Sequence, residues 1–573
     1  MKTWRTSNKS WAVLITIMAL TSCTRLFQGS DLDQNPNSPV LSEVDLSSLT
    51  RGTLVGLGWL HEDQDVRIAY MWGGQLKGQG RQSQGFGTYT VSAFNFDWSS
   101  YYNTGANIRL IQQKASADNN KVQLGAGQVM EALLFTKLIS LWGDVPYSEA
   151  FDIVNHPTPK YDEQLSIYNE LITLLSTAYT NLNSGTGTIT GDFIYRGEAS
   201  LWAAAAKTLQ ARLYLHLKDY TNAAAAAALG IKSLGAGFSG GGGDMLMPHG
   251  TAYQVDINSN NAFFDVNNSG DCSFDPPAYL PVFMCTNLVS GTYAKDLALR
   301  NVKTDETGMY FHFFAYGSKT KSTNLEPNSR TGFFVAKAPQ PWLTFYENQL
   351  ILAESKARLS RTGTADPAAL AALNTVRTGL ASGYINGLTA DPSLLKRSGK
   401  ITCASTSKAV VGVKTKFTTE FIVNQQIADS VGNVLGTISA ITDDYHLILT
   451  ANSTEDIPLN RSYKLNGLVY DRYVVADFSQ GGIANPGKKF PDGNTALLTE
   501  IASEKFVTLL SQYEVFNELR RLQAATPTIT LGIPIINGSK YPARYIYPQQ
   551  ELNTNPNCPN PAPDQFVRLP VFQ

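Results

Sequence analysis

The 573-residue sequence has no marked excess of charge of either sign and few His and Cys residues, the types that most often bind metals. Its 46 Lys and Arg balance 47 Asp and Glu, and it holds only 6 His and 5 Cys. A near-neutral chain lacks the surplus of cations that binding to nucleic acid or to an anionic membrane surface requires. Scarce His and Cys leave little for metal-dependent hydrolysis, so we expect neither a metal site nor a cofactor.

Motifs of the common enzyme classes are also missing. The sequence contains no GxSxG elbow, HExxH helix or phosphate-binding loop. His61-Glu62 opens like a zinc-binding helix, but Asp65 stands where the second His is needed. Asp443 and Asp444 fall in a predicted turn, which favours solvated turn residues over the acid/base pair of a glycoside hydrolase. The sequence therefore predicts a binding protein without catalytic residues.

Residues 1–22 have the pattern of an export signal. A basic start precedes a short apolar run, Trp11–Leu20, which is too short to span a bilayer. The run ends in Leu20-Thr21-Ser22-Cys23, which resembles a bacterial lipobox and predicts acylation of Cys23. Acyl chains contribute roughly 0.8 kcal/mol per buried methylene, so a multiply acylated Cys23 would anchor the protein to a membrane. A plain secretory signal with a chance Cys is the alternative.

The other cysteines and one acidic segment give no metal motif. Cys272, Cys285, Cys403 and Cys558 form no CxxC and no Cys/His cluster. Cys272 and Cys285 could pair in an oxidising compartment, and the spacing leaves that open. Residues 31–37 alternate oxygen ligands like a calcium loop, but Pro36 replaces the obligatory Gly, which favours a tether.

Helical patterns dominate from Ser47 onward. Residues 130–142 are apolar on most sides and stop at Gly143, which predicts a buried helix. Asp162 is expected to cap the next helix. Two helical hairpins, residues 199–231 and 346–380, have a layout that resembles tetratricopeptide units. A further amphipathic helix is predicted from Thr499 through Leu519.

Two regions break this pattern. Residues 235–340 are rich in Gly, Asn, Pro, Phe and Tyr and show little periodicity, as functional loops do. Residues 401–468 switch to short alternating segments separated by turn signals, which predicts an inserted small β-barrel-like domain. Strands are expected at residues 409–413, 421–423, 434–441 and 446–450.

Aromatic side chains in polar surroundings indicate a binding surface. Rings combined with amide and guanidinium groups recognise sugars and peptides. We expect ligand contacts from the Trp72–Trp98 stretch and from the region between Tyr279 and Tyr316, although packing in the core is the alternative for each ring. The candidate residues are Trp72, Arg81, Tyr89, Asn95, Trp98, Tyr279, Phe283 and Tyr310.

Several motifs, in order along the chain, resemble the SusD/RagB outer-membrane lipoproteins. Besides the lipobox they are "DLDQNPNSP" (31–39), "LWGDVPYSEAF" (141–151), "FYENQLILAESKARL" (345–359), "YEVFNELRRL" (513–522) and "YPARYIYPQQELNTNPN" (541–557). The resemblance implies a mainly α fold with tetratricopeptide-like hairpins and long loops. It assigns residues 23–400 and 469–573 to this helical domain, while the β insertion at 401–468 is not part of the family's common core.

The resemblance also implies a function. It predicts a lipid-anchored protein on the outer face of the outer membrane that captures an oligosaccharide or a peptide. It implies a SusC-like TonB-dependent transporter as partner, with this chain as its lid for nutrient import. A surface adhesin or scaffold that uses the β insertion to bind a protein or matrix is the alternative, and a glycan hydrolase is the third class.

Overall fold

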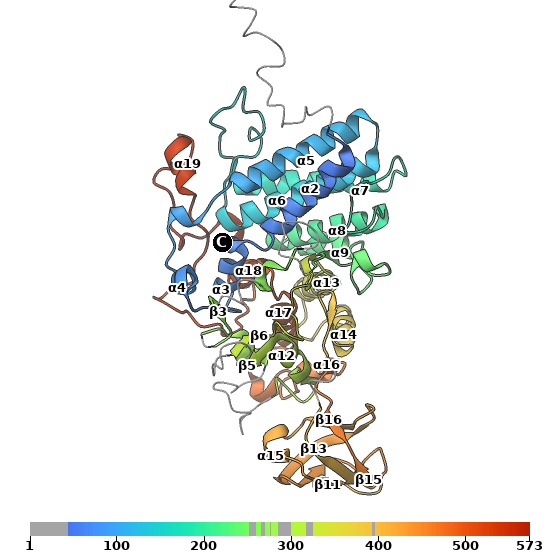
Figure 1. The fold of residues 1–573 in the computed structure, drawn as a ribbon. Coiled ribbons are helices and arrows are strands. Elements are labelled where there is room, and N and C mark those ends of the chain that lie inside the picture. Colours follow the sequence, from blue (N-terminus) through green and yellow to red (C-terminus); the bar gives the residue numbers. More distant parts are fainter. Residues whose placement is uncertain are drawn as a thin grey trace, which may run out of the picture.

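The computed structural model describes residues 44–250, 259–264, 270–275, 277–284, 299–316, 325–391 and 396–573. The expected export signal and Cys23 lie outside these residues. A large helical body fills most of the molecule, and a small unit of β-strands projects from one end of it (Figure 1). The predicted fold class, mainly α with a small all-β insertion, is confirmed.

Antiparallel helices that follow one another along the chain form the first half of the body. From α5 to α9 each helix packs on the next, as short connections dictate, and α2 packs on α5. Their bounds are α2 Leu46–Leu60, α3 Gln64–Trp72, α4 Arg81–Gly87, η1 Ala93–Asn95, α5 Ser99–Ala117, α6 Lys121–Trp142, α7 Gln164–Leu182, α8 Ala199–His216 and α9 Tyr220–Ala227.

Helix α6 is the centre of this half. By length and composition it could cross a membrane, but 94% of its most apolar 18-residue stretch is buried inside the protein, so it is a core helix. Gly143 ends it with φ +92°, and a Cβ there would lie 2.8 Å from Leu569. Only glycine satisfies both the backbone angle and this close approach. The prediction of a buried helix that stops at Gly143 is confirmed.

The two predicted hairpins are present. Asp219 caps α9 by accepting from the Asn222 amide, and Asp366 caps α14 by accepting from two amides. Helix α13 packs against α9, α14 and α17, so the hairpins stack on one another. The bounds here are α13 Phe345–Leu359, α14 Pro367–Ala381, α16 Val475–Phe478, η4 Pro486–Lys488, α17 Gly493–Thr508, α18 Glu514–Ala524, α19 Gln549–Thr554 and η5 Pro570–Phe572.

Two helix predictions were wrong in detail. Asp162 does not cap α7: its carboxylate accepts from the amides of Tyr147 and Ser148 and holds the preceding loop. The helix predicted through Leu519 is two helices, α17 and α18, separated by a turn in which Ser511 has φ +63°.

Short elements fill the segment between α9 and α13 and its neighbours. They are β1 Lys77–Gly78, η2 Gly237–Ser239, β2 Met245–Met247, β3 Cys272–Ser273, α11 Leu280–Met284, β4 Thr304–Asp305, α12 Thr307–Phe313, β5 Phe314–Tyr316, β6 Leu325–Pro327, β7 Gln340–Leu343, β8 Tyr384–Ile385, β9 Leu388–Thr389 and β17 Val469–Tyr470. Cys272 is a buried free thiol here, and Cys285 lies outside the described residues.

The β unit is one antiparallel sheet of seven strands with the order β15-β10-β11-β14-β13-β12-β16. The strands at its two edges, β15 and β16, are separated along the chain by Ser462 alone, so the sheet must curl back on itself. A hydrophobic core of its own fills the inside. The bounds are β10 Lys400–Cys403, β11 Ala409–Val413, α15 Phe417–Glu420, β12 Gln426–Asp429, β13 Val434–Asp443, β14 His446–Leu449, β15 Ile457–Arg461 and β16 Tyr463–Leu465.

Three of the four predicted strands are present, and the one at residues 421–423 was wrong because those residues form the turn between α15 and β12. The chain enters and leaves the unit side by side. Lys396 and Lys464 are antiparallel bridge partners, and the amide of Arg397 donates to the carbonyl of Tyr463 at 3.2 Å. A hydrogen-bonded base therefore closes the insertion.

A buried carboxyl group joins the loop region to α13. Asp244 accepts from the amide of Phe345 at 2.6 Å and from the hydroxyl of Tyr384 at 2.7 Å. Burial raises the pKa of Asp244 from 3.8 to about 7. The native state therefore holds this proton more tightly than the unfolded chain does, and the carboxyl group costs stability as the pH rises from 4 to 7.

The variant Asp244→Asn is expected to lose this pH dependence. Its free energy of unfolding, relative to wild type, should rise by about 1 kcal/mol per pH unit between pH 4 and 7. Urea unfolding at four pH values in this range measures the difference. The exposed Asp118→Asn serves as control and should follow the wild-type pH profile; a constant offset for Asp244→Asn would contradict the prediction.

Candidate ligand-binding cavity

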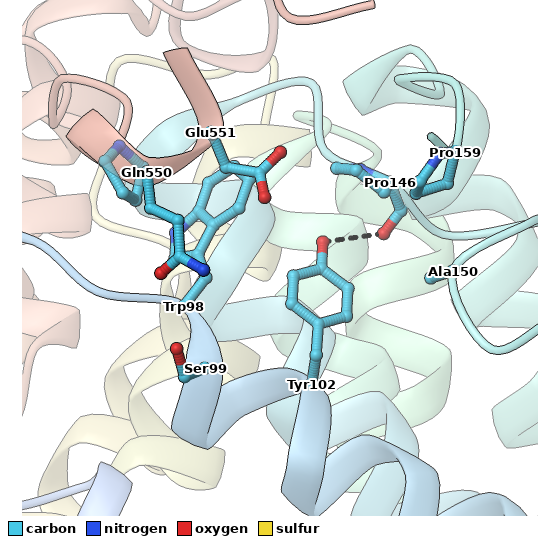
Figure 2. A pocket seen from close by; sticks show the side chains of 9 residues that line it. Trp98, Ser99, Tyr102, Pro146, Ala150, Pro159, Gln550 and Glu551 are labelled. Carbon is cyan, nitrogen blue, oxygen red and sulfur yellow. Dashed lines mark hydrogen bonds between the residues drawn. The ribbon is translucent and has the colours of Figure 1, made fainter. Parts of the chain in front are cut away.

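A cavity of about 200 Å³ lies where the start of α5, the loop after α6 and the start of α19 meet. Residues far apart in the sequence build it. Trp98, which precedes α5, and Ser99 and Tyr102 of α5 form the lower side of the cavity in Figure 2. Gln550 and Glu551 of α19 lie above them. Proline residues from the loop after α6 form the remaining wall.

Trp98 forms the back of the cavity. Its ring packs against Trp142, Tyr547 and Tyr161 with centroid distances of 5.9, 5.8 and 6.2 Å. Only 3% of the residue is exposed, yet its Nε1 donates to none of the described residues. A buried indole N–H normally has an acceptor, so this donor is available to a ligand or to water.

Tyr102 is held in place on the opposite side. Its hydroxyl donates to the carbonyl of Pro146 at 2.8 Å, the bond drawn in Figure 2. Burial, helped by the negative charge of Glu551, raises the pKa of Tyr102 well above 10. The ring is therefore a neutral, fixed wall at physiological pH.

Glu551 supplies the charged group of the cavity. Its Oε2 accepts from the Tyr161 hydroxyl at 2.9 Å and from the Asn555 amide at 3.4 Å. Asn555 also donates to the carbonyl of Pro159 at 2.9 Å, which fixes the end of α19 against the loop after α6. Both bonds to the carboxylate use Oε2, which leaves Oε1 without a partner among the described residues.

The cavity therefore combines aromatic rings with one carboxylate, one indole donor, an amide and a hydroxyl group. Sugars are bound by such sets, because rings cover the apolar face of a pyranose while polar groups bond its hydroxyls. In the described part of the chain, no group of three or more His, Cys, Asp or Glu side chains is placed to hold a metal ion.

Of the eight predicted contact residues, only Trp98 lines this cavity. Trp72 and Tyr89 lie together in the core, with ring centroids 6.3 Å apart and exposures of 1% and 5%. Asn95 uses its side chain to accept from the amide of Ser92. Arg81 is exposed and pairs with Asp271 at 3.3 Å. Contact with a ligand at these four positions stays a prediction, and the structure shows packing, turn and surface roles for them.

The second predicted cluster also packs internally. Tyr279 and Phe283 are half-buried and pack against Phe506. The ring centroids of Phe283 and Phe506 lie 5.2 Å apart in an edge-to-face arrangement. Tyr310 is 1% exposed and packs on Phe314 at 4.9 Å. These rings stabilise the loop region against α17.

Sequence reasoning missed Glu551, Gln550 and Pro146 as cavity residues. No periodicity marks them, because Gln550 and Glu551 lie in the six-residue helix α19 and Pro146 lies in the loop after α6. They do fall within two of the motifs that carry the family resemblance, residues 141–151 and 541–557, so the motifs held a signal that was not used.

Comparisons with known proteins agree with this fold. The SusD-like family described as "Starch-binding associating with outer membrane" matches residues 61–269. No curated protein matches the chain. A solved SusD/RagB family protein from Bacteroides thetaiotaomicron shares 20% identity, with a TM-score of 0.57 over 90% of this chain and 95% of that one.

Two further solved structures are similar. A chitin-binding protein shares 16% identity, with a TM-score of 0.52 over 90% of this chain and 95% of that one. A chitin-binding SusD homolog from Flavobacterium johnsoniae shares 13% identity, with a TM-score of 0.53 over 91% of this chain and 98% of that one. The resemblance expected from the sequence motifs is thereby confirmed: residues 61–269 match the SusD-like family, and solved SusD homologues share the fold of the chain.

Proposed function

We propose that this protein captures an oligosaccharide in the cavity between α5 and α19. The observation that carries the proposal is the set of groups that converge there: the Trp98 indole N–H and Oε1 of Glu551, neither of which has a partner among the described residues, and the Tyr102 ring. The matching family is described as starch-binding, and two of the similar solved proteins bind chitin. Both are neutral glucose-type polymers with apolar ring faces.

The membrane anchor, the location and the partner that we propose are drawn from the resemblance to the same family. The protein is held by an acylated Cys23 on the outer face of the outer membrane and serves as the lid of a SusC-like TonB-dependent transporter. It binds its ligand without cleaving it. Co-purification of a transporter with the acylated chain, and loss of the chain but not of the transporter from the membrane fraction after Cys23→Ala, would support this arrangement.

Calorimetric titration with starch-derived and chitin-derived oligosaccharides tests the proposed cavity. Glu551→Gln is expected to weaken binding of the accepted oligosaccharide about tenfold, because a hydrogen bond to a charged group contributes about 1.5–3 kcal/mol. Trp98→Ala should abolish binding but also disturbs core packing, so Glu551→Gln is the decisive variant.

Trp59→Ala is the matched control, since Trp59 is 55% exposed on α2 and lies outside the cavity. Its affinity should equal that of wild type. An unchanged affinity for Glu551→Gln would reject this cavity as the binding site.

The adhesin alternative is favoured by one observation. The outer face of the β unit exposes Val411, Val413 and Ile448 by 43, 46 and 42%, and β11 and β14 lie side by side in the sheet. Apolar side chains grouped on a sheet face suit contact with a macromolecule. Binding of a host protein or matrix that requires the β unit, in a chain that binds no oligosaccharide, would favour this second function.

A further inference from the structure

A second cleft, of about 370 Å³, lies between the end of α18 and the C-terminal segments 535–543 and 566–572. Its described lining contains three cations, Arg520, Lys540 and Arg568, and no carboxylate. Lys540 and Arg568 are exposed, whereas Arg520 is 5% exposed at the bottom. The cleft is thus positively charged on one side without internal compensation.

Arg520 is an unusual buried cation. It forms no ion pair with any described carboxylate, while its neighbour Arg521 pairs with both Glu354 and Glu518. Buried charges are as a rule paired, because burial without a counter-charge is costly. Burial lowers the pKa of Arg520 to about 9, and Glu514, whose charge reaches it, is bonded to His216 at 2.6 Å.

The hydrogen bonds of Arg520 leave room for a ligand. Its guanidinium group donates to the carbonyls of Phe516, Ala543 and Ser140 and to the side-chain oxygen of Asn517. A guanidinium group has five N–H donors. These four bonds fix its plane and leave one donor, on Nη1, for a further acceptor.

Aromatic rings complete the cleft. Phe572 lies under the Arg520 guanidinium with 4.5 Å from its centroid to Cζ, and Tyr541 and Phe566 belong to the lining. Phe566 is 37% exposed. A ring face beside a cluster of Arg and Lys is suited to a sugar that carries an oxyanion, because the ring covers the pyranose and the cations take the anion.

We propose that this cleft binds the oxyanion, carboxylate or sulfate, of an acidic saccharide, and so extends the ligand range beyond neutral sugars. The inference rests on the proposed function as a glycan-capturing protein. The cleft then selects sugars by charge, and the aromatic rings of the cavity at Trp98 stack on neutral sugar units.

The test compares three oligosaccharides of equal length, one neutral, one with uronic acid residues and one sulfated, by calorimetry at constant ionic strength. Inorganic sulfate alone is the fourth probe. Wild type should bind at least one acidic oligosaccharide tenfold or more tightly than the neutral one. The double variant Lys540→Gln/Arg568→Gln should lose that preference and keep the affinity for the neutral sugar.

The double variant Arg361→Gln/Lys488→Gln removes the same two charges from exposed sites elsewhere and should keep the preference. Because all four side chains are exposed, these variants are expected to fold, which thermal unfolding checks. The preferred acidic sugar identifies the oxyanion as carboxylate or sulfate.

Equal affinity of wild type for acidic and neutral sugars, or equal losses in both double variants, would overturn the inference while leaving neutral capture intact. If no neutral sugar binds but the acidic one binds in a manner that requires Lys540 and Arg568, the cleft stands and the cavity at Trp98 fails.

Discussion

Replacing Glu354 with alanine is expected to lower the free energy of unfolding by about 3–5 kcal/mol. Glu354 is 1% exposed and accepts from Arg521 at 2.6 and 2.8 Å, from Lys505 at 2.8 Å and from Arg358 at 2.9 Å. Burial alone would raise the pKa of Glu354, but these three cations hold it well below its usual range.

The loss is large because the cations remain. In Glu354→Ala, Glu518 is the only other carboxylate that pairs with Arg521 and Lys505 among the described residues. Two or three buried positive charges would then share one negative charge, and the connection between α13, α17 and α18 would weaken. Urea unfolding followed by circular dichroism measures the change.

Lys160→Ala is the control, because Lys160 is 56% exposed and its ion pairs among the described residues, with Glu149 and Asp162, are long at 3.7 and 3.8 Å. Exposed pairs contribute about 0–1 kcal/mol, so its stability should stay within that range. A loss below 1 kcal/mol for Glu354→Ala would mean that water or a rearranged Glu518 compensates the cations.

Trp72→Ala is expected to cost a similar amount, about 3–5 kcal/mol, and to leave oligosaccharide affinity of the folded protein unchanged. The ring makes edge contacts with Tyr545 at 5.1 Å and Phe516 at 5.5 Å, and its Nε1 donates to the carbonyl of Phe86 at 2.9 Å. Truncation removes these contacts and strands a buried acceptor.

This result would decide between the two roles that the sequence allowed for Trp72. Trp59→Ala removes the same side chain from an exposed site and should change stability by no more than about 0.5 kcal/mol. If Trp72→Ala instead kept wild-type stability and lost affinity, the ring would be a ligand contact and not a core residue.

The pattern of apolar residues was sufficient for the helices because each long helix buries a recognisable face. Residues 130–142 and the hairpin capped by Asp366 follow local rules, and local rules predicted them. The turn at Ser511 was missed because apolar spacing continues across it, and only the left-handed backbone of that residue breaks the helix.

The candidate site was harder to predict for a physical reason. Whether an aromatic ring is core or contact depends on partners distant in sequence: Tyr545 and Phe516 cover Trp72, while α19 leaves a gap above Trp98. Polar neighbours of Trp72 along the chain suggested exposure, but Gln75 is itself buried and donates to the carbonyl of Phe506. Local composition therefore located Trp98 and could not separate it from Trp72.

The closed base of the β insertion has a consequence for how such a chain can change. A disordered loop of roughly 70 residues would cost about 2 kcal/mol more in closure entropy than one of roughly eight. The bridge between Lys396 and Lys464 holds the two ends at the spacing of paired strands, about 5 Å. The contacts inside the insertion therefore offset the entropy cost of closing it. To the helical host the insertion is equivalent to a short hairpin turn. A short turn in its place would therefore close the helical host at a similar cost in chain entropy.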